Sequence, residues 1–353
     1  MKIAEYIWLD GAQPTQQVRS KARVLDLPAR PALEDLPVWG FDGSSTNQAD
    51  GGDSDLMLQP VCVVTDPLRG GDHVLVLCEV LLADGRPHQT NQRARLRDVL
   101  ERGASAEEPW FGFEQEYTLF SGGRPLGWPD SGYPAPQGPF YCGVGSEEAH
   151  GRDLVEAHTR ACIDAGLMIY GLNAEVMPGQ WEFQIGYRGV EGESADPLTV
   201  SDHLWISRWL LRRVGESFGV SAVLDPKPVR GDWNGAGAHT NFSTRGMRDE
   251  RLGFGFIRDA ISRLQAHHAE HIAEYGYGLE DRLTGQHETC SIHEFRAGVA
   301  DRGASIRTPR QVAQLGYGYL EDRRPGANCD PYRVCARILE TIVLSEMAVP
   351  AAV

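Results

Sequence analysis

Six side chains of the types that bind metal ions occur in a few short stretches of the 353-residue sequence. They are Glu114, Glu116, Glu175, Glu182, His239 and Glu321. Five are carboxylates and one is an imidazole, with no thiolate in the set. Hard oxygen ligands in clusters suit Mg²⁺ or Mn²⁺. The set therefore predicts a site for divalent cations if the fold brings these side chains together.

The first two carboxylates lie on a predicted strand over residues 110–120. Alternate residues of a strand share a face, so Glu114 and Glu116 point the same way. The segment contains no Lys or Arg. Two carboxylates on one face repel each other and lose hydration unless a cation lies between them. The alternative is an edge strand with a solvated acidic face.

A second stretch, residues 171–185, also lacks Lys and Arg and contains Glu175 and Glu182. As a strand it places Glu182 on one face with Gln180 and Gln184, and the apolar residues between them on the other. It repeats the acidic pattern of the first stretch, which strengthens the cation hypothesis.

His239 follows a glycine-rich turn and begins a polar strand within residues 234–244. Small residues let the backbone approach a ligand closely. An isolated histidine is more often a hydrogen-bonded core residue than a ligand. Together with two acidic strands, however, His239 favours metal or substrate binding.

The C-terminal part combines arginines with two acidic residues, Glu288 and Glu321. The arginines are Arg282, Arg302, Arg307, Arg323 and Arg324. Planar guanidinium groups match carboxylate and phosphate oxygens. Cations on one wall and arginines on the other would suit phosphoryl transfer, which needs charge neutralisation and positioning. Ordinary surface ion pairing is the alternative for any single arginine.

Two further patterns are weaker. Asp42–Thr46 is an acidic, hydroxyl-rich segment that, taken alone, predicts a surface turn. His267, His268 and His271 lie at helical spacing, and a solvated helix face is a better interpretation than a zinc site. The sequence contains neither a Walker A motif nor G-x-G-x-x-G, so a nucleotide would bind outside the usual phosphate loops.

Composition excludes several classes of protein. The formal charge of −15 argues against a nucleic-acid or acidic-membrane partner. Seven scattered cysteines without a C-x-x-C motif indicate reduced thiols in a cytoplasm. Glu5 and Asp10 interrupt the start, so no signal peptide is expected. The apolar stretch at 74–83 contains Glu79 and is too short to span a bilayer.

The periodicity predicts an α+β protein with two domains. Residues 1–87 are rich in short strands, and 84–91 have the composition of a linker. Residues 88–353 alternate helices with strands, and their sheet would carry the carboxylates. The clearest predicted helices are 93–102, 147–165, 202–218 and 256–275.

Nearly the whole chain resembles the type II, eukaryotic-like glutamine synthetases. The motifs that carry the resemblance are ordered along the sequence as Tyr6–Gly11, Asp42–Thr46, Glu114–Tyr117, Asn173–Pro178, Gln180–Gln184, Asn234–Thr244 and Glu321–Pro331. The resemblance implies a small β-grasp-like domain and a catalytic domain with a curved antiparallel sheet. It also implies an enzyme, a ligase of nitrogen assimilation that joins ammonia to L-glutamate through a γ-glutamyl phosphate, with ATP as co-substrate.

The resemblance further implies two or three Mg²⁺ or Mn²⁺ ions per active site. One group of ligands would lie near glutamate and ammonia: Glu116, Glu175 and Glu182. The other would face the ATP phosphates: Glu114, His239 and Glu321. Residues implied at the glutamate are Arg282, Arg302, Asn234, Gly235 and His239. Residues implied at the moving phosphoryl group are Arg307, Arg323 and Arg324.

Ammonium would be bound by Asp42 and Ser45 of a neighbouring subunit together with Tyr141. Glu288 resembles the carboxylate of a flap that closes the site and helps ammonium lose its proton. Positions similar to the family's nucleotide pocket are Trp110, Gln184, Asn241, Ser243, Arg248, Arg307 and Tyr319. The implied assembly is a homo-oligomer, a decamer of two pentameric rings with active sites between subunits.

Two departures from the family pattern stand out. Gly186 is followed by Tyr187 and an extended loop, Arg188–Ser201, where the family usually has a short connection. That loop would border the nucleotide pocket. Arg296 replaces a usually small residue downstream of Glu288, which affects the expected flap dynamics.

Other functions are conceivable for such a chain. A biosynthetic paralogue would ligate another amine or a glutamate analogue, but a bulky amine has no use for an anionic pocket formed by Asp42, Ser45, Tyr141 and Glu288. A non-catalytic assembly would lose a metal ligand, and all six are present.

Overall fold

The computed structural model describes residues 1–345, which divide into two compact units. Unit 1 consists of 1–94, 117–193 and 199–223, and unit 2 consists of 95–116, 194–198 and the chain from residue 224 onward. No helix within the described range is both long and apolar enough to cross a membrane.

A five-stranded sheet forms the N-terminal part of unit 1, in the order β2-β1-β5-β4-β3. The strands are β1 (Lys2–Leu9), β2 (Val18–Leu25), β3 (Trp39–Asp42), β4 (Asp55–Thr65) and β5 (Val74–Leu81). β1 and β5 are parallel, and the other neighbours are antiparallel. Alternate residues Ala4, Tyr6 and Trp8 of β1 pack into one apolar core, as strand periodicity requires. The expected β-rich N-terminal region is therefore present.

Two short 3-10 helices lie within this region, η1 (Leu33–Asp35) and η2 (Gly43–Thr46). The expected surface turn at Asp42–Thr46 is η2, whose N-terminus is capped by the Asp42 side chain. Ser44 donates its backbone N–H to that carboxylate at 3.0 Å. A short side-chain acceptor ahead of the first turn is what a helix start needs.

The rest of unit 1 packs helices against strands. The strands are the end of β6 (Trp110–Ser121), β7 (Arg124–Pro125), β8 (Ile169–Ala174), β9 (Gln180–Gly186) and β10 (Ser221–Val223). The helices are α2 (Arg152–Asp164) and α3 (Pro197–Phe218). β8 and β9 form an antiparallel hairpin. α3 buries Trp205, Trp209 and neighbouring aliphatic side chains.

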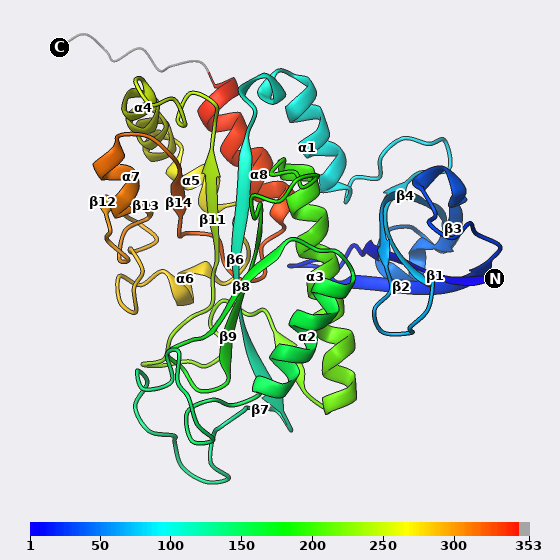
Figure 1. The fold of residues 1–353 in the computed structure, drawn as a ribbon, viewed down its shortest axis with the longest axis horizontal. Coiled ribbons are helices and arrows are strands. Elements are labelled where there is room, and N and C mark those ends of the chain that lie inside the picture. Colours follow the sequence, from blue (N-terminus) through cyan, green and yellow to red (C-terminus); the bar gives the residue numbers. More distant parts are fainter. Residues whose placement is uncertain (346–353) are drawn as a thin grey trace. The chain divides into compact units, whose positions relative to one another are not determined.

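Unit 2 contains the start of β6 together with β11 (Ala238–Ser243), β12 (Ala297–Val299), β13 (Ile306–Thr308) and β14 (Leu320–Asp322). β11 lies between β6 and β14 and is antiparallel to both (Figure 1). β13 is antiparallel to β14, but β12 is parallel to β13, so one pair departs from the expected antiparallel pattern.

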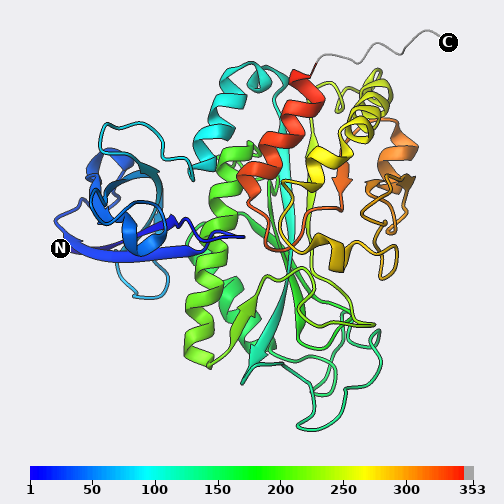
Figure 2. The ribbon, with the colours of Figure 1, turned by 180° about the vertical axis from the view of Figure 1, so that it is seen from behind.

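The helices of unit 2 surround these strands. They are α1 (Gln92–Glu101), η3 (Ala104–Glu107), α4 (Gly253–Ala266), α5 (His268–Ile272), α6 (Leu279–Arg282), α7 (Arg310–Leu315), α8 (Pro331–Leu339) and the π-helix η4 (Glu340–Leu344). α8 begins with Pro331 after the capping residue Asp330, a favoured helix start. The close neighbourhood of α5 and α8 can be followed in Figure 2.

Three predictions about helices need correction. The helix expected over 256–275 is divided at His267 into α4 and α5. The loop expected to run to Ser201 ends earlier, because α3 begins at Pro197. There Asp196 accepts the Leu198 N–H at 3.1 Å, which caps the helix. α2 begins at Arg152, later than the expected residue 147, after Gly151 adopts a left-handed conformation.

Candidate active site

Neighbouring strands of unit 2 bring three of the predicted metal ligands together. His239 of β11 lies opposite Glu114 of β6. Asn241, two residues further along the same face of β11, lies opposite Glu321 of β14. The ligand atoms of Glu114, His239 and Glu321 all lie within 4.8 Å of one another. Two carboxylates and one imidazole at this spacing fit a hard divalent cation.

His239 is the buried centre of this cluster. Its side chain is 6% exposed, and Nδ1 lies 3.4 Å from Glu114 Oε2 and 3.7 Å from Glu321 Oε1. Burial, followed by the positive charge of Arg323, holds the pKa of His239 well below its usual value. The imidazole is therefore neutral at pH 7, which is the form that binds metals.

The glycine-rich turn before β11 places Arg282 beside His239. Arg282 lies 3.1 Å from His239 Nε2 through its NH2 group. A Cβ on Gly237 would lie 2.3 Å from that NH2 group, and one on Gly235 would lie 2.7 Å from Arg282 Cγ. These positions need glycine because the guanidinium stem lies against the turn. Burial lowers the pKa of Arg282 to about 10, so the group remains charged.

Glu116 lies on the same side of β6 as Glu114, two residues further along. Its carboxylate accepts the backbone N–H of Gly237. It is 7% exposed, and burial raises its pKa although the charge of Arg282 opposes the change. The expectation that both carboxylates of this strand face one way is consistent with these contacts. A buried carboxylate with a raised pKa gains most from a nearby cation.

Glu321 lies between two arginines. Arg307 and Arg323 each place NH1 2.5 Å from one of its carboxylate oxygens. β13 supplies Arg307 directly opposite Glu321, and Arg323 follows on the same face two residues later. Arg323 is also held through Nε by the Arg302 carbonyl at 2.8 Å, whereas the Arg302 side chain is exposed. The cluster thus has guanidinium groups beside its carboxylates, suited to anionic oxygens.

Arg324 points to the other side of β14. It is 1% exposed, and it donates to both oxygens of Asp322 at 2.9 and 2.7 Å. Its NH1 group lies 3.1 Å from His268 Nδ1. Unlike Arg307 and Arg323, which contact Glu321, Arg324 is therefore bound by Asp322 and His268.

The partners of Arg324 were not predicted from the sequence. Asp322 accepts a hydrogen bond from the Tyr275 hydroxyl at 2.7 Å, and that hydroxyl lies 2.5 Å from His271 Nδ1. His271 is fully buried, so the expected solvated face for the histidines of 267–271 is wrong at this position. The signal that could have found Asp322 is strand alternation, since it stands between Glu321 and Arg323 and must face the opposite side.

Three residues similar to the family's nucleotide pocket, Trp110, Ser243 and Arg248, lie together at the paired ends of β6 and β11, whereas Gln184 belongs to β9 of unit 1. The Arg248 guanidinium lies 4.1 Å from the centre of the exposed Trp110 ring, and its NH1 donates to Ser243 Oγ at 2.9 Å. Asn241 donates to Glu114 Oε1 at 2.8 Å. Tyr319 is 43% exposed. An open aromatic face beside a cation suits a flat heterocycle.

The remaining predicted ligands belong to unit 1. Glu175 follows β8 and accepts from Asn173 Nδ2 at 2.9 Å. Glu182 of β9 accepts from Gln184 Nε2 at 2.6 Å, and it lies opposite Asn173 across the hairpin. Both carboxylates are buried, at 9% and 5% exposure. The hairpin therefore holds its own pair of inward acidic side chains.

Asp42 and Ser45 form a separate, exposed group in unit 1. The Ser45 hydroxyl donates to Asp42 Oδ2 at 2.6 Å, and the Ser44 hydroxyl donates to Oδ1 at 2.6 Å. Hydrogen bonds from Ser44 and then Ser45 lower the pKa of Asp42 to about 2. It is an anion throughout the neutral range. Tyr141, also of unit 1, is 51% exposed.

Comparison with known proteins identifies the family. The glutamine synthetase β-Grasp domain matches residues 1–83, and the glutamine synthetase catalytic domain matches residues 89–254. The first match confirms the β-grasp-like N-terminal region.

Curated relatives match along almost the whole chain. A glutamine synthetase of Streptomyces viridochromogenes is 57% identical over 341 residues, covering 96% of each protein. The chloroplastic glutamine synthetase of Chlamydomonas reinhardtii is 55% identical over 350 residues, covering 96% of this chain and 90% of the relative.

A solved structure described as a GmaS/ADP complex shares the fold. It has a TM-score of 0.71 at 22% identity and covers 96% of this chain and 77% of that one. At this identity the likeness concerns the fold alone. The long, highly identical matches establish the assignment: the chain belongs to the glutamine synthetase family.

Proposed function

We propose that this chain is a glutamate–ammonia ligase, which joins ammonia to L-glutamate with ATP and releases glutamine, ADP and phosphate. The observation that carries the proposal is the buried Glu114–His239–Glu321 cluster beside cationic arginines in a chain of this family. Phosphorylation of the γ-carboxylate creates an acyl phosphate, and ammonia then displaces the phosphate. Positioning and charge neutralisation supply most of the catalysis in such a reaction.

Two groups of residues would hold Mg²⁺ or Mn²⁺, two or three ions per site. Glu114, His239 and Glu321 form one group, and the family pattern assigns Glu116, Glu175 and Glu182 to the other. When bound, such ions neutralise phosphate oxygens and polarise the transferred group. The donor set supports this choice, since carboxylates and a neutral imidazole suit Mg²⁺ and Mn²⁺.

Arginines would bind the anionic parts of the substrates. We assign Arg282 and Arg302 to the glutamate carboxylate, with Asn234, Gly235 and His239 nearby. Arg307 and Arg323 would stabilise the moving phosphoryl group, and their contact with Glu321 supports a place at the metal site. Arg324 would act through its neighbours, because its guanidinium is engaged by Asp322 and His268.

ATP would be held outside any phosphate loop. The adenine would lie against Trp110 and Arg248, whose 4.1 Å contact already forms a stacking surface. Gln184, Asn241, Ser243, Arg307 and Tyr319 complete the assigned pocket. Polar side chains from several strands give hydrogen-bond donors and acceptors without a glycine-rich loop.

Ammonium would be captured by anionic groups. Asp42 is suited to this role because it is an exposed carboxylate that is negative at neutral pH, and hydrogen bonds from Ser44 and Ser45 lower its pKa further, to about 2. Ser45 and Tyr141 would shape the pocket, and Glu288 would close it as a flap and accept the proton of ammonium. A closed flap also keeps the acyl phosphate from water.

The assembly and domain division are part of the proposal. We assign 1–87 to a β-grasp domain and 88–353 to a catalytic domain, supported by family matches over 1–83 and 89–254. Asp42 would reach the site of a neighbouring subunit in a decamer of two pentameric rings. The seven cysteines are free thiols, which supports a reducing compartment such as the cytoplasm.

The test is an assay of ADP and glutamine formation with L-glutamate, ATP and Mg²⁺, in which ammonium is compared with a panel of primary amines. We expect one glutamine per ADP with ammonium and a far lower kcat/KM for every amine. A higher kcat/KM for one of the amines would contradict the assignment and indicate a ligase for that amine.

A further inference from the structure

The segment that carries Glu288 has a buried root and an exposed tip. We call residues 284–291 the flap. Thr289 and Cys290 are buried, whereas Glu288 is exposed. At the root, Thr284 and Ser291 form an isolated β-bridge, and the Thr289 hydroxyl donates to the Gln286 carbonyl at 2.7 Å. The root is therefore fixed, and the position of Glu288 depends on what holds the tip.

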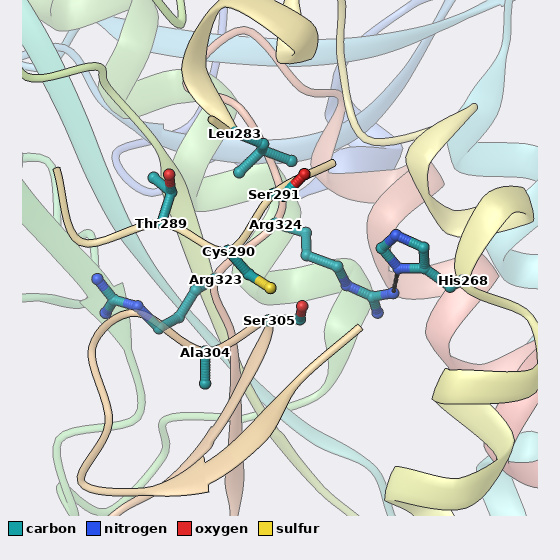
Figure 3. Close-up of a pocket in the computed structure, with 9 residues that line it drawn as sticks. All are labelled: His268, Leu283, Thr289, Cys290, Ser291, Ala304, Ser305, Arg323 and Arg324. Carbon is teal, nitrogen blue, oxygen red and sulfur yellow. Dashed lines mark hydrogen bonds between the residues drawn. The ribbon is translucent and has the colours of Figure 1, made fainter. Parts of the chain in front are cut away.

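The flap root packs closely against neighbouring residues of unit 2. A cavity of about 10 Å³ lies between the flap root and the residues that follow β14, and its lining includes Thr289, Cys290, Arg323 and Arg324. Figure 3 shows these side chains around it, with Arg324 pointing to His268. The cavity has room for roughly one water molecule. The root thus lies beside Arg323 and Arg324, the two residues that directly follow β14.

The tip has an unusual backbone. His287 and Glu288 have φ angles of 52° and 59°, consecutive left-handed conformations in residues other than glycine. This conformation is strained in residues other than glycine, and such strain persists only where surrounding contacts hold it. The tip therefore needs ties to the rest of unit 2.

One tie crosses an open groove. We call residues 225–235 the substrate loop, because it contains Asn234 and Gly235. A groove of about 410 Å³ lies between Lys227, Arg230 and Gly231 of this loop and Asp281, Thr284, Gln286 and His287. His287 Nε2 lies 2.9 Å from Asp232 Oδ1, an ion pair whenever the imidazole is protonated. The His287 side chain is 17% exposed, whereas that of Asp232 is 93% exposed.

The substrate loop is itself anchored, which makes it a suitable support. The Lys227 ammonium group donates a hydrogen bond to the Trp233 carbonyl, and the Ala236 N–H donates one to the Pro226 carbonyl at 2.8 Å. The loop also lies against Arg282: a Cβ at Gly235 would lie only 2.7 Å from Arg282 Cγ. On the other side of the tip, Arg323 lies 3.4 Å from the Glu288 carbonyl through NH2. The tip is therefore connected both to the substrate loop and to the arginine beside Glu321.

We propose that the Asp232–His287 pair is a latch that positions the flap carboxylate Glu288 for capture of ammonia. Asp232 is then a positioning residue of the reaction, acting through His287. The inference rests on the proposed function of Glu288. If the latch is lost, the flap opens more often and water attacks γ-glutamyl phosphate. That attack returns glutamate and phosphate, so ATP is consumed without glutamine formation.

The experiment measures ADP formed per glutamine at subsaturating ammonium in four variants. Asp232→Ala removes the latch, and Asp232→Asn keeps an acceptor without the charge. The exchange Asp232→His with His287→Asp rebuilds the pair in reverse, and aspartate tolerates a left-handed backbone. Asp281→Asn is the matched control, since it removes another exposed carboxylate from the same groove.

We expect Asp232→Ala to raise the ratio of ADP to glutamine about two- to fivefold, the range open to an exposed ion pair. Asp232→Asn should give a smaller rise, the exchanged pair should return toward the wild-type ratio, and Asp281→Asn should match wild type. Because Asp232 is almost fully exposed, its replacement leaves the packing intact, which thermal unfolding verifies.

Two outcomes overturn the latch. A wild-type ratio in Asp232→Ala shows that the pair does not control the flap. An equal loss of glutamate phosphorylation and glutamine formation, with an unchanged ratio, shows a purely structural role. Glu288→Ala separates this from the proposed function: if that variant also captures ammonia normally, the flap role of Glu288 itself is wrong.

Discussion

Two buried histidines, His158 in unit 1 and His239 in unit 2, share a physical state and differ in their partners. As whole residues they are 1% and 5% exposed. Burial lowers the pKa of His158 to about 4 and that of His239 well below its usual value. His158 Nε2 lies 3.0 Å from the Ser207 carbonyl and 3.2 Å from the Cys162 sulfur, and its ring packs edge-on against Phe183.

The surroundings of His239 are of a different kind. Its Nδ1 faces two carboxylates, and its Nε2 lies beside Arg282. A lowered pKa alone therefore does not indicate function in this molecule. What distinguishes the site is a neutral imidazole within a few ångströms of several charged groups. Burying charged groups costs free energy, and clusters of this kind are concentrated at functional sites.

The largest effect should come from a ligand of the His239 region. Glu321→Gln keeps the shape of the side chain but removes the charge that faces His239, Arg307 and Arg323. We expect glutamine formation to fall at least about a hundredfold, since even residues that only orient metal ligands contribute ten- to hundredfold. Near-normal turnover at saturating Mg²⁺, with the variant folded by circular dichroism, would remove Glu321 from the metal site.

The His158 region should instead control stability in acid. Unfolded histidine takes up a proton below about pH 6.5, whereas folded His158 does so only near its pKa of about 4. The unfolded state binds more protons between these values, so this contribution to stability is full above pH 6.5 and declines as pH falls toward 4. The difference corresponds to roughly 3 kcal/mol.

His158→Gln should lack the pH-dependent stability that comes from the lowered pKa of His158. We expect its urea midpoint to fall less than that of the wild type between pH 7 and pH 4.5, while its turnover at pH 7 stays within about twofold. Identical pH slopes for the two proteins would show that His158 takes up its proton over the same pH range in the folded and unfolded states, which would contradict the lowered pKa.

The sequence was sufficient for the strands of the site because their pattern is local. Glu114 and Glu116 alternate on one strand, and their common face follows from a period of two. It was insufficient for the buried side of β14. His271 is buried because it contacts Tyr275 and Thr341, the latter 70 residues away, and no local pattern contains that contact. The break at His267, whose φ of −105° and ψ of 19° leave the helical region, was not predicted either.

A smaller effect should come from the support of β14. Tyr275→Phe removes the hydroxyl that donates to Asp322 and lies 2.5 Å from His271 Nδ1. Asp322 keeps its donor Arg324, whereas the buried His271 Nδ1 loses this partner. An unsatisfied buried group costs about 1–3 kcal/mol, and we expect unfolding to become easier by an amount in that range. Equilibrium unfolding in urea measures the change. The same loss in Tyr117→Phe, whose buried hydroxyl has no hydrogen-bond partner among the described residues, would show that the hydrogen bond is not its cause.

An active site shared between subunits, as proposed above, predicts partial complementation between two inactive variants. Asp42→Ala and Glu116→Ala should each be inactive alone, because one lacks the carboxylate proposed to bind ammonium and the other lacks a proposed metal ligand. After dissociation and random reassembly, about a quarter of the interfaces should have both halves intact. Activity returning toward that fraction supports the arrangement. If mixed oligomers verified by mass spectrometry stay inactive, Asp42 does not serve a neighbouring subunit.

The comparison of the two histidines is tested most directly by titrating Mn²⁺ into the wild type, His239→Asn and His158→Gln in a calorimeter without nucleotide. If the β6, β11 and β14 cluster holds the cation, His239→Asn should weaken Mn²⁺ binding at least about tenfold, and His158→Gln should bind as the wild type does. Equal Mn²⁺ affinity in the wild type and His239→Asn would contradict the central claim that His239 is a metal ligand.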